Sequence, residues 1–156
     1  MAFAPKRILV CTDFSGPSQA AADAAADLAR LFGGTLTLVH VVPLSAYVNF
    51  AEELGQTASW SANVQETVSA SAEATLQREA QRLARPGLEI NCFKTDGPAQ
   101  TEVARIADLE RIDLVVCGSH GRTGLRHVLV GSVAEGIVRH CKCPVLVFHG
   151  SLGKEA

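Results

Sequence analysis

Long apolar runs and blocks of basic residues are missing from this 156-residue sequence. No 18 consecutive residues are apolar, so we expect no membrane-spanning helix. The start, MAFAPKR, leads straight into a strand-like run at Ile8 and lacks the pattern of a signal peptide. The net charge is −2 and no Lys/Arg-rich block is present, so a broad nucleic-acid surface is not expected either.

The sequence also lacks cysteines at the spacing of a paired motif. The five cysteines are Cys11, Cys92, Cys117, Cys141 and Cys143, and none form a CxxC pair. An odd number of cysteines, three of them in or beside apolar runs, is typical of reduced core thiols, and we expect a cytoplasmic protein. The Cys-Lys-Cys segment at 141–143 beside His140 lacks the further ligands that a metal site needs, so we predict no metal site.

What the chain does have is a composition suited to one globular domain. Hydrophobic residues make up 47% and charged residues 19%. A chain of this length buries roughly 70% of the surface that its unfolded form exposes, enough for a core without disulfides or metals. We predict a single domain over residues 1–156, with a frayed tail at 150–156.

Five apolar runs predict β-strands, and helical patterns lie between them. Several runs are apolar on successive residues, as in strands that are covered on both faces. The predicted strands are 7–11, 35–42, 88–94, 113–117 and 144–148, and the predicted helices begin near residues 15, 62, 98 and 132. Strict alternation of strand and helix predicts an α/β fold, a five-stranded parallel sheet with helices on both faces.

Two local expectations complete the prediction of structure. Residues 43–60 are the least regular segment, hold the single Tyr and the single Trp, and are predicted to form a loop excursion. In the last helix, Val133, Ile137 and Val138 are predicted to face the core.

Ligands of open α/β sheets bind beyond the carboxyl ends of the strands, and two segments have suitable residues there. The first is Thr12-Asp13-Phe14-Ser15, directly after the first strand. The Asp13 carboxylate is able to bind ribose hydroxyls or a base edge. The alternative is that Asp13 or Ser15 only caps the first helix.

The second segment, residues 118–132, follows the fourth strand and is rich in glycine. Gly118, Gly121 and Gly131 allow positive φ and a close approach of backbone N–H groups to an anion. Ser132 begins the last helix, where unpaired N–H groups and the helix dipole favour a phosphate, and Arg122 is near enough in sequence to add a cation. The alternative is a surface loop with glycines for turns. Neither a Walker motif nor a GxGxxG after the first strand is present.

The glycine-rich segment resembles the signature of the universal stress protein family. That signature is Gly, two residues, Gly, nine residues, Gly, then Ser or Thr, and Gly118, Gly121, Gly131 and Ser132 match every position. The Asp13 turn, the Val41-Val42 end of the second strand and the final CPVLVF strand also look like this family, so the resemblance covers nearly the whole chain.

The resemblance implies a Rossmann-like sheet of order 3-2-1-4-5, a homodimer and ATP bound with Mg²⁺. By this analogy Asp13 and Val41 or Val42 lie at the adenosine end, the three glycines and Ser132 lie along the phosphates, and Ser119 and His120 line the loop. The predicted nucleotide-binding residues are Thr12, Asp13, Val41, Val42, Gly118, Ser119, His120, Gly121, Arg122, Gly131, Ser132 and Val133. An apolar edge strand invites pairing with a second chain, so the dimer is expected through Val145–Phe148.

Three interpretations of function stay open. The first is an ATP-binding stress-response protein that acts as a sensor or adaptor with little or no turnover. The second is a slow ATPase or nucleotide-processing enzyme, for which a water-orienting group and a metal clamp are needed. The third is a dimeric interaction module that binds AMP or another adenine nucleotide, such as a cyclic one. We predict no catalytic residue, and we expect His120 to be a polar loop residue.

Overall fold

The computed structural model describes residues 2–55, 62–120 and 130–149. Along these residues strands and helices alternate, except for two consecutive helices after the second strand. The elements are β1 (Arg7–Cys11), α1 (Gly16–Phe32), β2 (Thr35–Val42), α2 (Leu44–Glu53), α3 (Ala62–Leu83), β3 (Glu89–Asp96), α4 (Ala99–Leu109), β4 (Leu114–Gly118), α5 (Ser132–His140) and β5 (Val145–Phe148). The five predicted strands are confirmed, with ends shifted by one or two residues in β3, β4 and β5.

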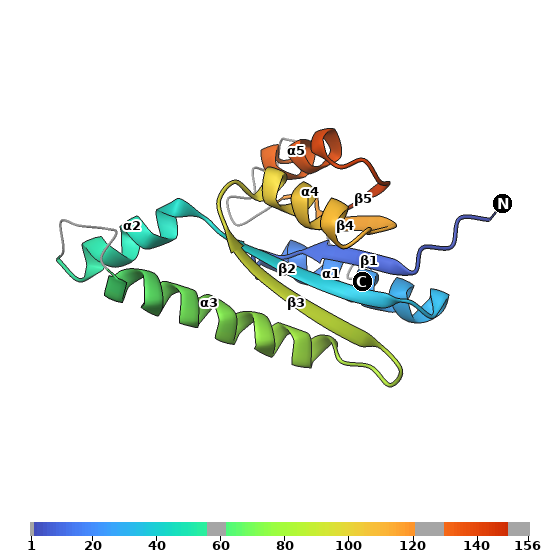
Figure 1. Ribbon diagram of the computed structural model, residues 1–156, viewed down its shortest axis with the longest axis horizontal. Coiled ribbons are helices and arrows are strands. Elements are labelled where there is room, and N and C mark those ends of the chain that lie inside the picture. Colours follow the sequence, from blue (N-terminus) through green and yellow to red (C-terminus); the bar gives the residue numbers. More distant parts are fainter. Residues whose placement is uncertain (1, 56–61, 121–129, 150–156) are drawn as a thin grey trace, which may run out of the picture.

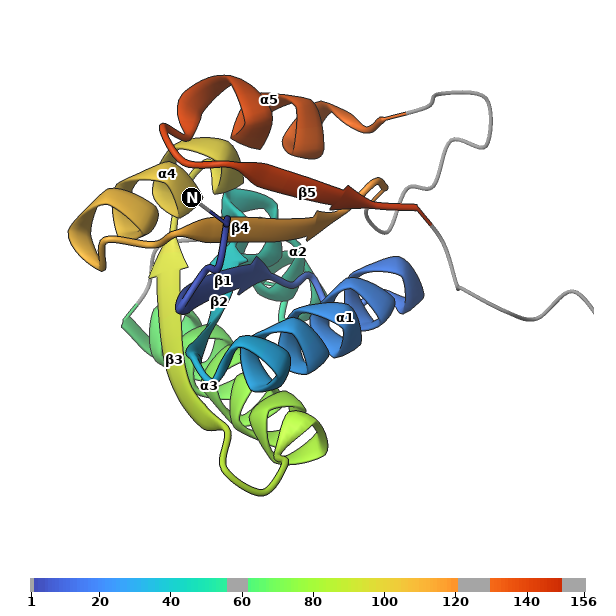
Figure 2. The same cartoon turned by 90° about the vertical axis from the view of Figure 1, so that its right-hand side faces the viewer.

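All five strands form one parallel sheet in the order β3-β2-β1-β4-β5, which confirms the predicted fold. In the centre, Leu9 of β1 lies opposite Thr37 of β2 and opposite Val115 of β4. Helices α1 and α3 cover one face of the sheet, and α4 and α5 cover the other (Figures 1 and 2). The strand order reverses between β1 and β4, and ligands of such sheets bind in the crevice at that point.

An apolar cluster lies on each face of the sheet. Ile8 and Val10 of β1 belong to the cluster under α1 and α3, whereas Leu9 belongs to the cluster under α4 and α5. The buried face of α1 is made of alanine, because Ala21, Ala22, Ala25, Ala26 and Ala29 are all fully buried. Such small side chains let the helix lie close to the sheet, which fixes its first turn near the ends of β1 and β4.

The prediction that residues 43–60 are irregular is wrong, because this segment contains helix α2. Tyr47 and Ala51, one turn apart, are buried in a third apolar cluster together with Val42 of β2 and Val64 of α3. The Tyr47 hydroxyl also donates a hydrogen bond to Asp96 Oδ1. Contact with α3, rather than a strong apolar stripe of its own, stabilises α2. Helix α2 and the first turns of α3 extend past the carboxyl ends of the strands (Figure 1).

The predicted inner face of the last helix is correct at one position of three. Ile137 is fully buried, but the side chains of Val133 and Val138 are 45% and 49% exposed. The buried residue one turn before Ile137 is Ala134. The spacing of three from Ala134 to Ile137 sets the inner face, and β-branched Val133 and Val138 lie to either side of it.

Three smaller expectations concern the thiols, the single Trp with the C-terminal tail, and membrane-spanning helices. The five cysteines are free thiols, and Cys117 is buried. Trp60 and the tail at 150–156 lie outside the described residues. Among the helices of the described residues, none is both long enough and apolar enough to cross a bilayer.

Candidate functional site

A cavity of about 1130 Å³ opens at the carboxyl ends of β1, β2 and β4. Its walls also include the first turn of α5 and parts of α2 and α3. Ten predicted site residues line it together: Thr12, Asp13, Val41, Val42, Gly118, Ser119, His120, Gly131, Ser132 and Val133. Gly121 and Arg122 lie outside the described residues. Segments more than 100 residues apart in the sequence therefore meet in one hollow at the crevice of the sheet.

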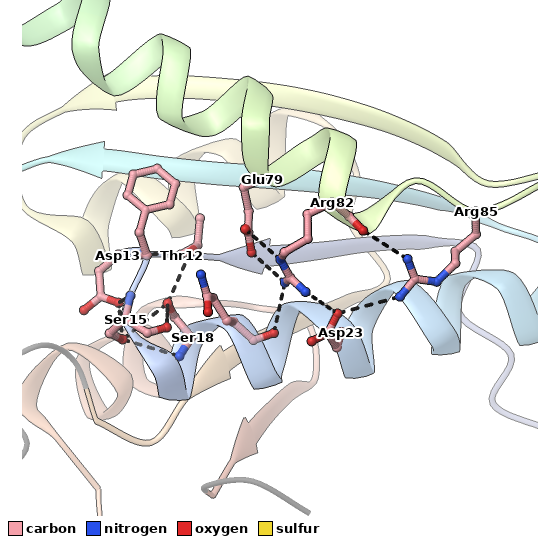
Figure 3. Close-up of polar contacts among 10 residues, drawn as sticks. Thr12, Asp13, Ser15, Ser18, Asp23, Glu79, Arg82 and Arg85 are labelled. Carbon is pink, nitrogen blue, oxygen red and sulfur yellow. Dashed lines mark hydrogen bonds and ion pairs between the residues drawn. The ribbon is translucent and has the colours of Figure 1, made fainter.

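The turn from β1 to α1 is held by the side chain of Thr12, which is 1% exposed. The Thr12 amide donates to the Val39 carbonyl at 2.9 Å, so the pairing of β1 with β2 continues into the turn. Thr12 Oγ1 accepts from the Phe14 amide at 3.0 Å and lies 3.1 Å from Ser18 Oγ (Figure 3). Thr12 therefore contributes to the site by fixing the turn that carries Asp13.

Ser15 caps helix α1, whereas Asp13 orients Ser15 and lines the cavity. Ser15 is the N-cap of α1, and its hydroxyl accepts from the Ser18 amide at 3.4 Å. Asp13 Oδ1 accepts from both the Ser15 amide at 3.0 Å and the Ser15 hydroxyl at 2.5 Å (Figure 3). Asp13 thus orients the capping residue, while its half-buried carboxylate lines the cavity.

His40 and Phe14 form the floor between β1 and β2. His40 is 8% exposed, and its Nδ1 donates to the Thr12 carbonyl oxygen at 2.8 Å. The Phe14 ring lies 4.4 Å from the His40 ring, centre to centre. Phe14 has a φ of 64°, a left-handed backbone conformation that is uncommon for an aromatic residue. Such strain persists only where the surroundings enforce it, and it clusters at functional sites.

Gly118, at the end of β4, and Gly131, the N-cap of α5, serve close packing rather than a positive φ. Gly131 has a φ of −72° and Gly118 is not left-handed either, so the expected positive φ is wrong at these two positions, whereas Gly121 lies outside the described residues. A Cβ on Gly118 would lie 3.2 Å from the Pro17 carbonyl carbon, at the start of α1. A Cβ on Gly131 would lie 3.1 Å from the Ser119 carbonyl oxygen. Both glycines bring backbone segments together around the cavity.

The N-terminus of α5 faces the cavity without a side-chain cap. Gly131 is the N-cap residue and makes no side-chain hydrogen bond there, and Ser132 is exposed. Next to it, Ser119 is 3% exposed and its Oγ lies 3.0 Å from His120 Nδ1. The first N–H groups of a helix lack partners within the helix and attract anions. This part of the cavity therefore suits a phosphate group.

The described lining of the cavity is acidic. It includes Asp13, Glu53 and Glu135, and it includes no lysine or arginine. Glu135 is 57% exposed and pairs with Arg139 at 2.7 Å. Two thiols also line the cavity: burial raises the pKa of Cys11 to about 12 and that of Cys117 to about 11. These thiols stay protonated at neutral pH, which makes them poor nucleophiles.

Sequence reasoning missed the wall that α2 and α3 provide. Its members have side chains that are mostly apolar or hydroxyl-bearing: Ala46, Asn49, Phe50, Glu53, Thr67, Val68, Ser71, Ala72 and Thr75. One signal was available, because Thr67, Ser71 and Thr75 recur every four residues on one face of α3. That spacing indicates a shared face but does not say what the face meets.

Comparison with known proteins matches the chain to one family over almost its full length. The model of the universal stress protein family matches residues 5–149. Universal stress protein MJ0531 of Methanocaldococcus jannaschii is 31% identical over 142 residues, which cover 91% of this chain and 81% of that protein. Protein MJ0577 of the same organism is 25% identical in its solved structure, with a TM-score of 0.78 over 97% of this chain and all of that one.

Two solved universal stress proteins carry nucleotides. One is in complex with cAMP, is 22% identical, and has a TM-score of 0.62 over 95% of this chain and 99% of that one. The other, from Archaeoglobus fulgidus, is in complex with dAMP, is 22% identical, and has a TM-score of 0.64 over 91% of this chain and 96% of that one. Fold, sheet order and sequence similarity agree, and this chain belongs to the universal stress protein family.

Proposed function

We propose that the cavity binds an adenine nucleotide, ATP together with Mg²⁺, and that the protein acts as a nucleotide-dependent sensor or adaptor with little or no turnover. The observation that carries this proposal is the N-terminus of α5, whose N-cap residue Gly131 makes no side-chain hydrogen bond and which opens into the same cavity as the Asp13 carboxylate. One end then offers backbone N–H groups to phosphate, and the other offers an acceptor to ribose hydroxyls.

Each end of the site has residues that suit its part of the nucleotide. Ser132 adds a hydroxyl donor at the start of α5, beside Gly131. Val41, at the end of β2 and in the cluster under α4 and α5, offers an apolar surface to the adenine ring. Asp13 is held in place through Ser15, so its carboxylate is already oriented before a ligand arrives.

The acidic lining gives Mg²⁺ a role in this proposal. Asp13, Glu53 and Glu135 repel a bare triphosphate, and the described lining offers no Lys or Arg to offset them. A divalent cation neutralises phosphate charge and takes oxygen ligands, which the phosphates themselves would supply, because the described residues hold no group of three His, Cys, Asp or Glu side chains for a metal. When bound, the metal supplies charge compensation for the phosphates. The residues of this chain bind and orient the nucleotide around it.

Low turnover follows from where the acidic groups lie. Hydrolysis needs a group that orients water in line with the γ-phosphate. Asp13 Oδ1 is engaged by Ser15, and Glu135 is exposed and paired with Arg139. N–H groups and a hydroxyl bind the ground state as well as the transition state, which does not accelerate chemistry. AMP or a cyclic nucleotide is the second candidate, favoured by the relatives in complex with cAMP and dAMP.

We also propose a cytoplasmic homodimer that forms through β5. This strand lies at the sheet edge, beside β4 alone, and Leu146 on it is 38% exposed. A second copy paired along β5 would cover this edge. The free thiols of the chain suit a reducing compartment.

The direct test of the nucleotide is its recovery from the purified protein. Heat-denatured protein should release an adenine nucleotide that chromatography of the supernatant identifies. Recovery of ATP supports the proposal, and recovery of AMP or a cyclic nucleotide favours the second candidate. An empty supernatant, together with no stabilisation by any of these nucleotides at millimolar concentration, would contradict both.

A further inference from the structure

The cavity extends beyond the proposed nucleotide site to the other face of the sheet. Its volume of about 1130 Å³ exceeds the roughly 300–1,000 Å³ of most small-molecule pockets. Val41 and Cys117 in its wall belong to the cluster under α4 and α5, whereas Phe14 packs on the cluster under α1 and α3. We propose that the part on the α1/α3 side is a separate binding site for an uncharged apolar small molecule.

We call this part the apolar side lobe. Its walls are Phe14, Val42, Ala46, Phe50, Val68 and Ala72. Four of them come in helical pairs: Ala46 and Phe50 are one turn apart on α2, and Val68 and Ala72 are one turn apart on α3. All four also border the apolar cluster around Val42, which closes the lobe toward β2.

Small side chains keep the lobe open. Alanine at 46 and at 72 leaves space that a larger apolar residue would fill. Both alanines are only half-buried, as is Phe50, so apolar surface remains accessible inside the cavity. Covering such surface with an apolar ligand removes it from water, which is favourable.

The polar groups near the lobe are few and partly engaged. Thr75 Oγ1 donates to the Ser71 carbonyl at 2.9 Å and accepts from the Arg78 guanidinium at 3.0 Å. Thr67 and Ser71 lie on the same face of α3 and also line the cavity. These hydroxyls are able to bind one neutral polar group, such as an alcohol or a carbonyl, at the edge of an apolar molecule.

Charge disfavours an anionic ligand in the lobe, because Arg78 contacts the Thr75 hydroxyl at 3.0 Å but does not itself line the cavity. The described lining has no Lys or Arg, and Glu53 of α2 lies in the same wall as Phe50. A buried carboxylate without a cation is strongly unfavourable. The occupant is therefore a neutral molecule, such as a medium-chain alcohol, rather than a fatty-acid anion. Phe14 directly follows Asp13, so the lobe and the proposed nucleotide end share the β1–α1 turn.

Fluorescence of N-phenyl-1-naphthylamine, an uncharged apolar probe, tests the lobe in the full chain without nucleotide. We expect a saturable rise in fluorescence with about one probe per chain. Ala72→Phe should fill the lobe and weaken probe binding at least tenfold. Ala74→Phe is the matched control, because Ala74 is exposed on the same helix and does not line the cavity. Ala46→Leu fills the lobe from α2 and serves if Ala72→Phe does not fold.

Three results would overturn the inference. The first is no saturable binding to the wild type, and the second is unchanged binding to both folded lobe variants. The third is displacement of the probe by octanoate at concentrations equal to or lower than those of octan-1-ol, because a neutral lobe should prefer the alcohol. The proposed function has its own failing result. If the protein binds the probe but binds no adenine nucleotide, the proposal of the lobe stands and the proposed function is wrong.

Discussion

Gly131 is in direct contact with the carbonyl oxygen of Ser119. The Gly131 amide donates to this oxygen at 2.6 Å, and a Cβ on Gly131 would lie 3.1 Å from it. The Ser119 amide in turn donates to the Phe148 carbonyl at 2.9 Å, which ties the segment to β5. The position of the α5 N-terminus relative to β4 thus depends on the absence of a side chain at residue 131.

Gly131→Val should weaken ATP binding at least about tenfold while the protein still folds. The valine side chain must push α5 away from Ser119, which moves the N–H groups proposed to bind phosphate. The fold should survive because the φ of −72° suits any residue and the site lies outside the apolar clusters.

Calorimetry with ATP and Mg²⁺ measures the affinity, and circular dichroism checks the fold. Gly16→Ala is the matched control, because a Cβ on Gly16 meets no atom within 4 Å. Wild-type affinity in Gly131→Val would mean that the phosphates bind elsewhere.

Why this glycine matters could not be worked out from the sequence. Its spacing from Gly118 and Ser132 marked it as part of a site. One expected reason, a positive φ, is wrong, and the other, a close approach to a phosphate, stays a prediction. The structure adds an approach to Ser119, twelve residues earlier, which depends on how β4 and α5 pack. The strand runs and the Ser15 cap could be predicted because they depend on local patterns of residues.

The α2/α3 wall of the cavity was missed for a similar reason. Tyr47 and Ala51 give α2 too few buried positions for a clear helical stripe, and contact with α3 supplies the rest. Ala46 and Ala72 carry no chemical signal in the sequence, and their importance comes from the space that they leave open. Patterns of single elements do not reveal a surface that two helices form together.

Glu79 should be important for stability although it is charged. It is 5% exposed and binds the Arg82 guanidinium at 2.8 and 2.9 Å, and Arg82 also binds Asp23 of α1 at 2.8 Å (Figure 3). Glu79→Ala leaves Arg82 without its buried partner. Loss of one member of a buried pair costs about 3–5 kcal/mol, and we expect about 1–3 because Arg82 is 37% exposed.

Urea unfolding of Glu79→Ala beside Glu73→Ala measures this effect. Glu73 is exposed on the same helix and accepts a hydrogen bond from Gln77, so its loss should change the free energy of unfolding by less than about 0.5 kcal/mol. Equal effects of the two substitutions would refute the role of the Glu79–Arg82 pair within α3.

Protonation of the Asp113 carboxylate should lower the stability of the protein at acidic pH. Partial burial raises the pKa of its carboxyl, but hydrogen bonds from the backbone amides of Arg7 and Lys6, at 2.8 and 3.0 Å, bring the net pKa below its usual value. A lowered folded-state pKa gives stability that is present above the unfolded pKa of about 4 and is lost as pH falls through the folded value.

Asp113→Asn should therefore cost about 1 kcal/mol at pH 7, a value reduced because the side chain is 34% exposed. At pH 3 the difference from the wild type should be smaller. Urea unfolding at the two pH values measures it, and an equal cost at both would contradict the role of the charged form.

The proposed dimer predicts twice the chain mass of 16.5 kDa in light scattering. Leu146→Lys places a charge on the exposed face of β5 and should shift the protein toward monomer. Val147 is unsuitable for this test, because it packs on the cluster under α4 and α5. Leu31→Lys, at a position 76% exposed on α1, is the control and should stay dimeric. A wild-type monomer at high concentration would rule out the β5 dimer.

Titration of ATP and Mg²⁺ into the wild type and into Ser132→Ala by calorimetry tests the central claim most directly. The wild type should bind with a Kd in the micromolar range, which corresponds to a binding free energy of about −8 kcal/mol. Ser132→Ala loses one hydrogen bond to a charged group, about 1.5–3 kcal/mol, and should bind at least about tenfold more weakly. No heat and no thermal stabilisation of the wild type up to millimolar ATP, or equal affinity in both proteins, would contradict the proposed binding of phosphate at the start of α5.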